Sequence, residues 1–145
     1  MQIRPGELAD SEAIAALLTD LGYPTAAALV AANLRRQLVH PDAALLVAVE
    51  NKAVIGLTAL NFIPQLALAG DFCRISYFCV APEARGRGVG AALEDAACEL
   101  AQARGCDRME VHCHSRRERA HQFYYRQGYT ESPKYLQKTL GTKTS

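Results

Sequence analysis

Three glycines alternate with other residues at Gly86, Gly88 and Gly90, directly after a β-rich run and directly before a helical pattern. The first turn of a helix leaves about four backbone N–H groups without partners, and the helix dipole adds roughly half a positive charge there. Glycines lack the Cβ that would keep a phosphate away from the backbone. Arg85 and Arg87 add cationic side chains at the same place. We therefore expect this loop to bind a phosphate group.

Two common phosphate-binding motifs fit the loop poorly. The nucleotide P-loop requires a lysine directly after its last glycine, and none follows here. A dinucleotide fingerprint, GxGxxG or GxGxxA, can be read at Gly86, Gly88 and Ala91, but that motif usually occupies the first βα turn of its fold. Here it lies past the middle of a 145-residue chain, which leaves too few residues for the remaining strands. A dinucleotide is therefore the less favoured ligand.

Residues 80–90, VAPEARGRGVG, resemble the acetyl-CoA signature of the GNAT acetyltransferases. The core of that signature is Gln or Arg, two residues, Gly, one residue, then Gly or Ala, and Arg85, Gly88 and Gly90 match it. Residues 120–129, AHQFYYRQGY, resemble the second block of the family, a Phe-Tyr pair with Gly-Phe or Gly-Tyr four residues after the Tyr. The end of the chain is most similar to small-amine acetyltransferases of the aminoalkylphosphonate type.

Periodicity and turn residues predict a mixed α/β fold with the element order β-α-α-β-β-β-α-β-α-β. Gly56 inside the third strand indicates a bulge or a close backbone approach. The resemblance implies a GNAT-like, mostly antiparallel sheet with helices on both faces, and we expect a single domain over residues 1–145. The strands are expected at residues 2–5, 43–49, 53–62, 72–80, 108–113 and 134–140, and the helices at 11–21, 24–38, 89–104 and 116–127.

The resemblance also implies where a cofactor lies. In the family, the pantetheine arm of coenzyme A inserts between two strands that splay apart, matched here by residues 72–80 and 108–113. Backbone groups of Phe78 and Val80, with Cys79 between them, are then expected to hold the arm. The pyrophosphate is expected on the loop Arg85, Gly86, Arg87, Gly88, Val89 and Gly90. Acetyl-CoA is the implied cosubstrate, and no metal is implied.

The implied chemistry is direct attack of a primary amine on the thioester. Tyr124 matches the family tyrosine that protonates the departing thiolate, and an ordinary phenol, with a pKa of about 10, carries its proton at neutral pH. Ala120 lies on the same helix face by four-residue spacing and leaves room for the cofactor thiol. The alternative is that Tyr124 is a core aromatic residue beside Phe123.

The general base is not assigned by the resemblance. Relatives often carry a glutamate on the strand before the glycine loop, and Tyr77 occupies that position here. His112 could accept the proton directly or through water, or it could be a half-buried structural histidine. The run His112-Cys113-His114 does not predict a metal site, because adjacent side chains on a strand point to opposite faces.

The acceptor pocket of the family lies at the first two helices and their link, here residues 21–25. Tyr23, Tyr77 and Tyr135 are the candidates to line it. This mixture of aromatic and neutral groups favours a small-molecule amine. Two alternatives stay open: a protein N-terminal or lysine acetyltransferase, and a non-catalytic acyl-CoA-binding regulatory module that has lost its base.

Composition excludes several other classes. Sixteen Lys and Arg balance fifteen Asp and Glu, so the basic excess of a nucleic-acid-binding surface is missing. The five cysteines are odd in number and form no CxxC pair, which is typical of thiols in a reducing compartment. Residues 1–5 have no apolar h-region, so we expect no signal peptide, and no apolar run approaches the roughly 18 residues of a membrane span. We expect a cytoplasmic protein without membrane partners, and a homodimer stays open as its oligomeric state.

Overall fold

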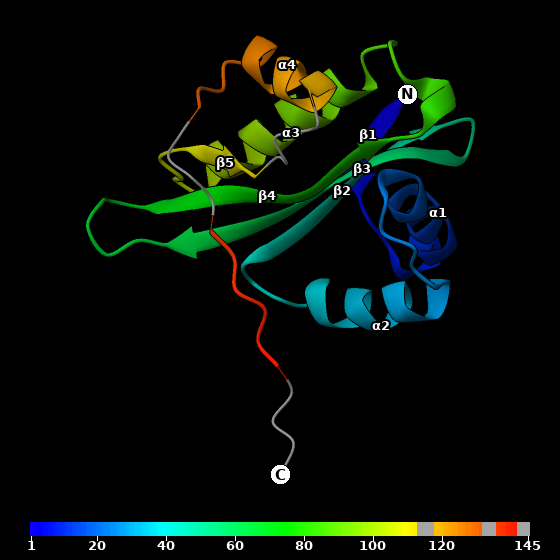
Figure 1. Ribbon diagram of the computed structural model, residues 1–145, viewed down its shortest axis with the longest axis horizontal. Coiled ribbons are helices and arrows are strands. Elements are labelled where there is room, and N and C mark those ends of the chain that lie inside the picture. The colour runs from blue at the N-terminus through cyan, green and yellow to red at the C-terminus, as the bar shows by residue number, and fades with distance from the viewer. Residues whose placement is uncertain (113–117, 132–135, 142–145) are drawn as a thin grey trace. The chain divides into compact units, whose positions relative to one another are not determined.

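The computed structural model describes residues 1–112, 118–131 and 136–141. The chain divides into two compact units, Met1–Val111 and His112–Ser145. The first unit contains a five-stranded sheet and the helices α1 to α3, and the second contains helix α4, Glu118–Arg126 (Figure 1).

The order of the strands in the sheet is their order in the sequence. The first four strands pair antiparallel, each with the next, and the fifth is parallel to the fourth. A mixed, mostly antiparallel sheet is thereby confirmed. The strands are β1 (Gln2–Pro5), β2 (Ala43–Glu50), β3 (Ala53–Pro64), β4 (Asp71–Val80) and β5 (Met109–Val111).

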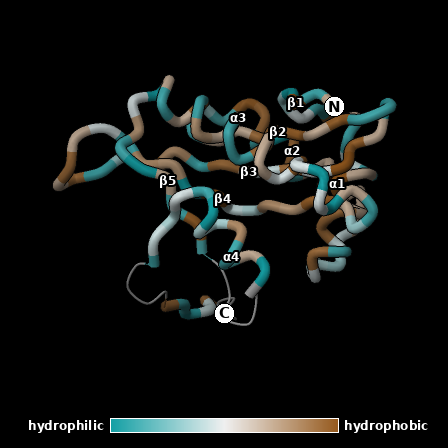
Figure 2. The backbone as a smooth tube through the Cα atoms, turned by 90° about the horizontal axis from the view of Figure 1, so that it is seen from above, coloured by the Kyte–Doolittle hydropathy of each residue, from teal (hydrophilic) through white to brown (hydrophobic). Residues whose placement is uncertain are grey.

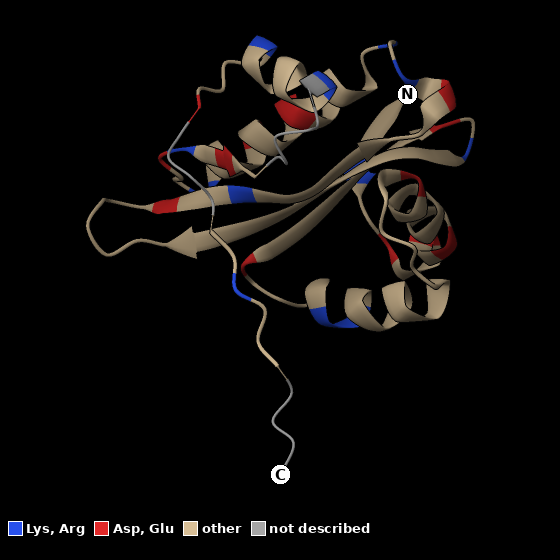
Figure 3. Ribbon diagram, viewed as in Figure 1, with Lys and Arg blue, Asp and Glu red and all other residues tan. Residues whose placement is uncertain are grey.

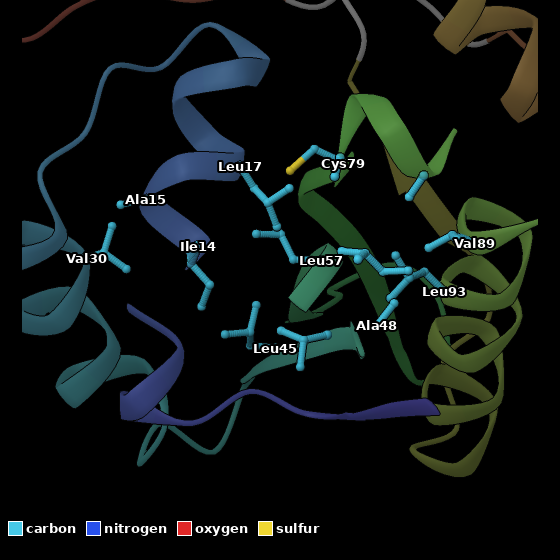
Figure 4. Packing of buried hydrophobic residues seen from close by; sticks show 14 of the residues in the cluster. Ile14, Ala15, Leu17, Val30, Leu45, Ala48, Leu57, Cys79, Val89 and Leu93 are labelled. Atoms are coloured by element: carbon cyan, nitrogen blue, oxygen red, sulfur yellow. The ribbon is translucent and has the colours of Figure 1, made fainter. Parts of the chain in front are cut away.

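Helices cover both faces of this sheet, as predicted. The helices α1 (Ser11–Leu21) and α2 (Ala27–Gln37) lie on one face, and α3 (Val89–Ala103) lies on the other (Figures 1 and 4). Helix α1 ends at Gly22, whose φ of 112° is left-handed and suits a residue without a Cβ.

Helix α2 begins later than the predicted residue 24. Its N-cap, Ala26, is extended with φ −75° and ψ 143°. The hydroxyl of Thr25 donates to the carbonyl of Tyr23, and this local bond holds the link in a non-helical turn. The prediction that Pro24 and Thr25 start the helix is therefore wrong.

The core is built from side chains that alternate between the two faces of the strands. Leu45 and Leu57 lie on the face of the sheet covered by α1, whereas Ala48 lies on the face covered by α3 (Figure 4). Hydrophobic residues follow the central strands in Figure 2. Each large apolar side chain buried in this way contributes about 1.5–3 kcal/mol.

The predicted irregularity at Gly56 is confirmed in both senses. Ala48 pairs with Gly56 and Val49 with Val54, so β3 carries one extra residue beside the glycine. A Cβ on Gly56 would lie 3.0 Å from Leu93 Cδ1 of α3 and 3.2 Å from a β4 carbonyl oxygen. The glycine thus allows the first turns of α3 to pack closely against the sheet.

The β3–β4 hairpin is longer than predicted. The sequence assigned residues 63–71 to a loop, but Ile63 pairs with Phe72 and Pro64 with Asp71. Gly70, with a φ of 75°, provides the left-handed residue of the turn. The amide of Gln65 donates to the Gly70 carbonyl oxygen at 3.2 Å and closes the turn.

Three other boundaries differ or fall outside the described residues. Strand β5 is shorter than the predicted 108–113, and α4 begins at Glu118, with residues 116 and 117 not described. The predicted last strand, 134–140, lies partly outside the described residues, and residues 136–140 form no strand. Leu136 and Leu140 are both 85% exposed, so burial does not favour pairing there.

Candidate active site

The glycine loop connects β4 to α3. Strand β4 ends at Val80, a short 3-10 helix spans Pro82–Ala84, and the backbone then turns through Gly86 and Gly88 at φ of 78° and 82°. Proline cannot donate to a sheet ladder, which accounts for the end of the strand. A Cβ on either glycine would meet no atom within 4 Å. The glycines therefore serve the left-handed turn and leave the space above the backbone open.

The first turn of α3 lies next to this loop and carries the positive end of the helix dipole. Gly88 is the N-cap, and Ala92 donates to its carbonyl oxygen at 3.1 Å. The amide groups of Val89, Gly90 and Ala91 precede the first intrahelical bond. No acidic residue lies in the first turn, so nothing there offsets the positive end of the helix dipole. The arrangement suits an anion.

The two loop arginines differ in their partners. Arg87 Nη1 lies 3.0 Å from Glu50 Oε1, and the two side chains are 50% and 32% exposed. Exposed ion pairs of this kind contribute at most about 1 kcal/mol, so a phosphate can replace Glu50. Arg85 Nε donates to the Val80 carbonyl oxygen at 3.3 Å, which holds the side chain along the end of β4.

Strand β4 shares only its first part with β5. The parallel register joins Cys73 to Met109 and ends where Ile75 pairs with Val111. Strand β4 itself runs on to Val80. Within the described residues the ladder ends at Ile75 and Val111, and the splay of the two strands stays a prediction.

The three predicted cofactor contacts on β4 differ in burial. Phe78 and Val80 are half-buried, whereas Cys79 is buried. The Cys79 side chain belongs to the core, beside Leu17 and Leu57 (Figure 4). Any contact of Cys79 with a ligand on the opposite side of the strand would therefore use its backbone.

Tyr23 and Tyr77 are 54 positions apart in the sequence, but their side chains lie together in the structure. Their ring centroids are 5.6 Å apart, with an interplanar angle of 82°. The rings are 52% and 42% exposed. An edge-to-face pair with this separation is a favourable aromatic geometry. Both belong to the first unit, and the third candidate for the acceptor pocket, Tyr135, lies outside the described residues.

The predicted acid and base belong to the second unit. On α4, Tyr124 is buried at 7% exposure, and its ring contacts Phe123 at 5.2 Å and Tyr129 at 5.3 Å between centroids. Ala120 precedes it by one helical turn on the same face. His112 follows β5 directly and is exposed.

A polar cluster on β4 and β5 was not identified from the sequence. Arg108 lies 2.7 Å from Glu110, and Arg74 Nη2 lies 3.3 Å from the other carboxylate oxygen. Burial raises the pKa of Glu110, but hydrogen bonds from Arg108 and Arg74 outweigh it and hold the pKa below its usual range. Glu110 is thus an ionised partner of two arginines and a poor general base near neutral pH.

Other features of the described residues lie elsewhere. A shallow groove between β1 and α3, bordered by Ile3, Leu46 and Ala96, contains none of the predicted site residues.

Within residues 1–112, 118–131 and 136–141, no group of three or more His, Cys, Asp or Glu side chains is placed to hold a metal. None of the helices in the described ranges is both long and apolar enough to cross a membrane. Cys113 and His114 are not described.

Comparison with known proteins identifies the class. The model of the Acetyltransferase (GNAT) family matches residues 12–129, so the chain belongs to this acetyltransferase family. The match runs across both units. The predicted family and the predicted transferase activity are confirmed.

The chain is similar to a curated relative and to several solved structures. The chain is 30% identical over 136 residues to the aminoalkylphosphonate N-acetyltransferase of Salmonella typhimurium, covering 90% of this chain and 86% of the relative. It is similar to a transcriptional regulator from Bacillus halodurans, with 25% identity, a TM-score of 0.88 and coverage of 96% and 99%. AAC(6')-Iy, solved with the bisubstrate analogue CoA-S-monomethyl-acetylneamine, shares the fold at 17% identity, with a TM-score of 0.84 and coverage of 97% and 98%.

Proposed function

We propose that the protein is an acetyl-CoA-dependent N-acetyltransferase that acetylates the primary amine of a small molecule. The observation that carries this proposal is the left-handed glycine loop at the start of α3, placed directly after a strand whose ladder with β5 ends early. The loop offers amides to a pyrophosphate, and the end of the ladder offers a strand edge to the pantetheine arm.

The residues present fit coenzyme A. Open space above Gly86 and Gly88 lets a phosphate reach the backbone, and the first turn of α3 has no acidic residue to repel it. Arg85 and Arg87 can bind phosphate oxygens in addition, Arg87 after release from Glu50. A bound CoA analogue in a protein of the same fold, AAC(6')-Iy, supports the choice of ligand.

In the proposed reaction the amine attacks the thioester carbonyl directly. An N–C bond forms and the C–S bond breaks, while the attacking nitrogen loses a proton to a base or water. We propose that the Tyr124 hydroxyl gives its proton to the departing sulfur. The amine must be neutral to attack, because an ammonium has no lone pair and an alkyl ammonium has a pKa of about 10.

Two of the described thiols, Cys73 and Cys98, are unsuited to forming a cysteine acyl-enzyme. Burial raises the pKa of Cys73 to about 12. Burial, together with the hydrogen bond that Cys98 donates to Glu94, raises the pKa of Cys98 to about 12 as well. The thiolate is the nucleophilic form of cysteine, so both thiols are inert near neutral pH.

A small acceptor is favoured by the Tyr23–Tyr77 pair, which presents two rings at a steep angle on the sheet face beside α1. The activity named for the Salmonella relative makes aminoalkylphosphonates one class to include among the acceptors. The proposal leaves the general base open between His112 and water.

A thiol-release assay with acetyl-CoA and a panel of amines tests the proposal. The panel contains aminophosphonates, polyamines, amino acids and peptides, and coenzyme A binding is measured separately by melting temperature. We expect acetyl transfer to at least one small amine. Release only with peptides would replace the small-molecule acceptor by a protein, and binding of acetyl-CoA without transfer to any amine would favour a regulatory module.

A further inference from the structure

A bulge in β4 places Arg74 and Tyr77 on the same face of the sheet. Arg74 pairs with Asn61 and Tyr77 pairs with Ala59, so the two β4 residues oppose β3 residues that are two apart. Residues two apart on a strand point to one face. Arg74 and Tyr77 are three positions apart on β4, and the bulge supplies the extra residue between them, Ser76. The face is the one on which Tyr77 contacts Tyr23.

Polar groups line this face between the two residues. The Ser76 hydroxyl donates to Asn61 Oδ1, which orients the Asn61 amide so that its NH₂ group faces away from Ser76. Ser76 and Asn61 are both exposed. Figure 3 shows basic and acidic residues on the neighbouring parts of β4 and β5.

Arg74 has hydrogen-bonding capacity that its ion pair does not use. Its single bond to Glu110, from Nη2, is long at 3.3 Å, and its Nε is buried without a partner among the described residues, so an incoming oxyanion would bind at the Nη groups. Arg108 binds the same carboxylate more closely, through Nε at 2.8 Å and Nη2 at 2.7 Å. The Arg74 side chain is 37% exposed. A guanidinium has five N–H donors, so Arg74 can bind another oxyanion while Arg108 retains Glu110.

We propose that Arg74, assisted by the Asn61 amide, binds an oxyanion carried by the acceptor, either a carboxylate or a phosphonate. This inference rests on the proposed function and names the substrate class: short primary amines with an anionic group at the other end. Two residues along β3 span about 7 Å, so a short alkyl chain joins an anion at Arg74 to an amine near the Tyr23–Tyr77 pair. Arg74 is a specificity-determining residue in this arrangement.

The test compares acceptors that differ in the group opposite the amine. β-Alanine and 2-aminoethylphosphonate carry an oxyanion, β-alaninamide is neutral, and 1,3-diaminopropane is cationic. Charge-assisted hydrogen bonds correspond to about 10- to 100-fold in affinity. We expect the wild type to favour at least one anionic acceptor over the amide by about that factor in kcat/KM. Which of the two anionic acceptors is favoured identifies the oxyanion.

Variants assign the preference to Arg74. In Arg74→Gln the preference for the anionic acceptor should fall about 10- to 100-fold, mainly through KM, and Arg74→Lys should restore part of it. Arg36→Gln is the matched control, because it removes one positive charge from an exposed residue of α2 that bonds to Asn33. A wild type that favours the amide or the diamine, or an Arg74→Gln variant that keeps the preference, overturns the inference.

A binding measurement separates this inference from the proposed function. Isothermal titration of β-alanine and 2-aminoethylphosphonate uses the wild type and Arg74→Gln, both saturated with coenzyme A. If no amine is acetylated but an anionic amine binds in an Arg74-dependent manner, the proposed function fails and the inference stands. If amines are acetylated without an Arg74-dependent preference, the inference alone fails. Absence of both activity and binding overturns both.

Discussion

Tyr23 in the α1–α2 link and Tyr77 on β4 form an edge-to-face pair, with ring centroids 5.6 Å apart and an interplanar angle of 82°. Each ring is about half exposed, at 52% and 42%. The pair thus connects the α1–α2 link to β4, the strand that precedes the glycine loop. It therefore relates the proposed acceptor region to the proposed cofactor region within one unit.

Removal of either ring should weaken acceptor binding more than cofactor binding. We expect Tyr23→Leu and Tyr77→Leu each to raise the KM for the amine about three- to tenfold, since an aromatic contact contributes about 0.5–1.5 kcal/mol. The Kd of coenzyme A, measured by titration, should change less than twofold. Tyr23→Phe keeps the ring and serves as control. If both leucine variants retain the wild-type KM, the pair does not contact the acceptor.

Substitutions at Gly88 and Gly90 should differ in their effect on stability but should weaken ligand binding alike. Gly88→Ala forces a Cβ into the left-handed region at φ 82° and should cost about 1–2 kcal/mol of unfolding free energy. Gly90→Ala lies within α3 and should not destabilise, because alanine favours a helix.

Both variants should bind coenzyme A more weakly, because the added Cβ obstructs the approach of phosphate to the backbone. Urea unfolding measures the first effect, and the shift of melting temperature with coenzyme A measures the second. NAD should give a smaller shift than coenzyme A with the wild type. An unchanged coenzyme A affinity in folded Gly88→Ala and Gly90→Ala would contradict the phosphate assignment.

Tyr124→Phe should reduce kcat by about 10²- to 10⁴-fold if the hydroxyl protonates the departing thiolate. The ring contacts with Phe123 and Tyr129 remain, so the variant should stay folded, which its melting temperature checks. The loss should shrink with a thioester whose thiol is more acidic, since that thiolate requires less protonation. Tyr125→Phe, at an exposed neighbouring residue, is the control. Retention of more than about half of kcat, with chemistry shown to limit the rate, would exclude the role.

The Arg4–Asp10 pair should make stability dependent on pH in the acid range. Both Arg4 Nη atoms donate to Asp10 carboxylate oxygens at 2.9 Å, and the Asp10 side chain is 8% exposed. The hydrogen bond from Arg4, with a further one from the Glu7 amide, outweighs burial and lowers the pKa of Asp10 below its ordinary value near 4.

Since the folded pKa is the lower one, the stabilisation is complete above about pH 4 and is lost as pH falls through the folded pKa. Asp10→Asn should therefore cost about 1.5–3 kcal/mol at pH 7 and progressively less below pH 4. Urea unfolding from pH 2.5 to 7 measures this, with Asp20→Asn at an exposed position of α1 as control. A constant difference between wild type and Asp10→Asn across that range would show that the pair does not act through ionisation.

Much of the fold was predictable because local patterns decide it. Gly22 ends α1 and the glycine loop precedes α3, as their conformational freedom requires. The start of α2 was not predictable, since a side-chain bond from Thr25 overrides the helical tendency of the sequence. The extent of the β3–β4 hairpin depends on register over many residues, and periodicity does not set it.

The site was predictable only where a motif marks it. The glycine loop that we propose to bind phosphate follows from glycine spacing, and the proposed role of Tyr124 from a family block. The cluster of Arg74, Arg108 and Glu110 carries no such mark, because residues 34 and 36 positions apart meet only through the parallel pairing of β4 and β5. Arg74 and Tyr77 share a face because of a bulge in β4, and no residue type in the sequence indicates that bulge.

The strand order β1-β2-β3-β4-β5 has a consequence for synthesis on the ribosome. Each strand adds to the edge formed by the strand before it, so no later strand has to insert between two earlier ones. The antiparallel part of the sheet, with α1 and α2 on its face, can assemble once β4 has emerged, before α3 is translated. A nascent chain halted after β4 would then carry the tyrosine pair and lack the proposed phosphate-binding loop, so that coenzyme A binding, as proposed, becomes possible only after these four strands have paired.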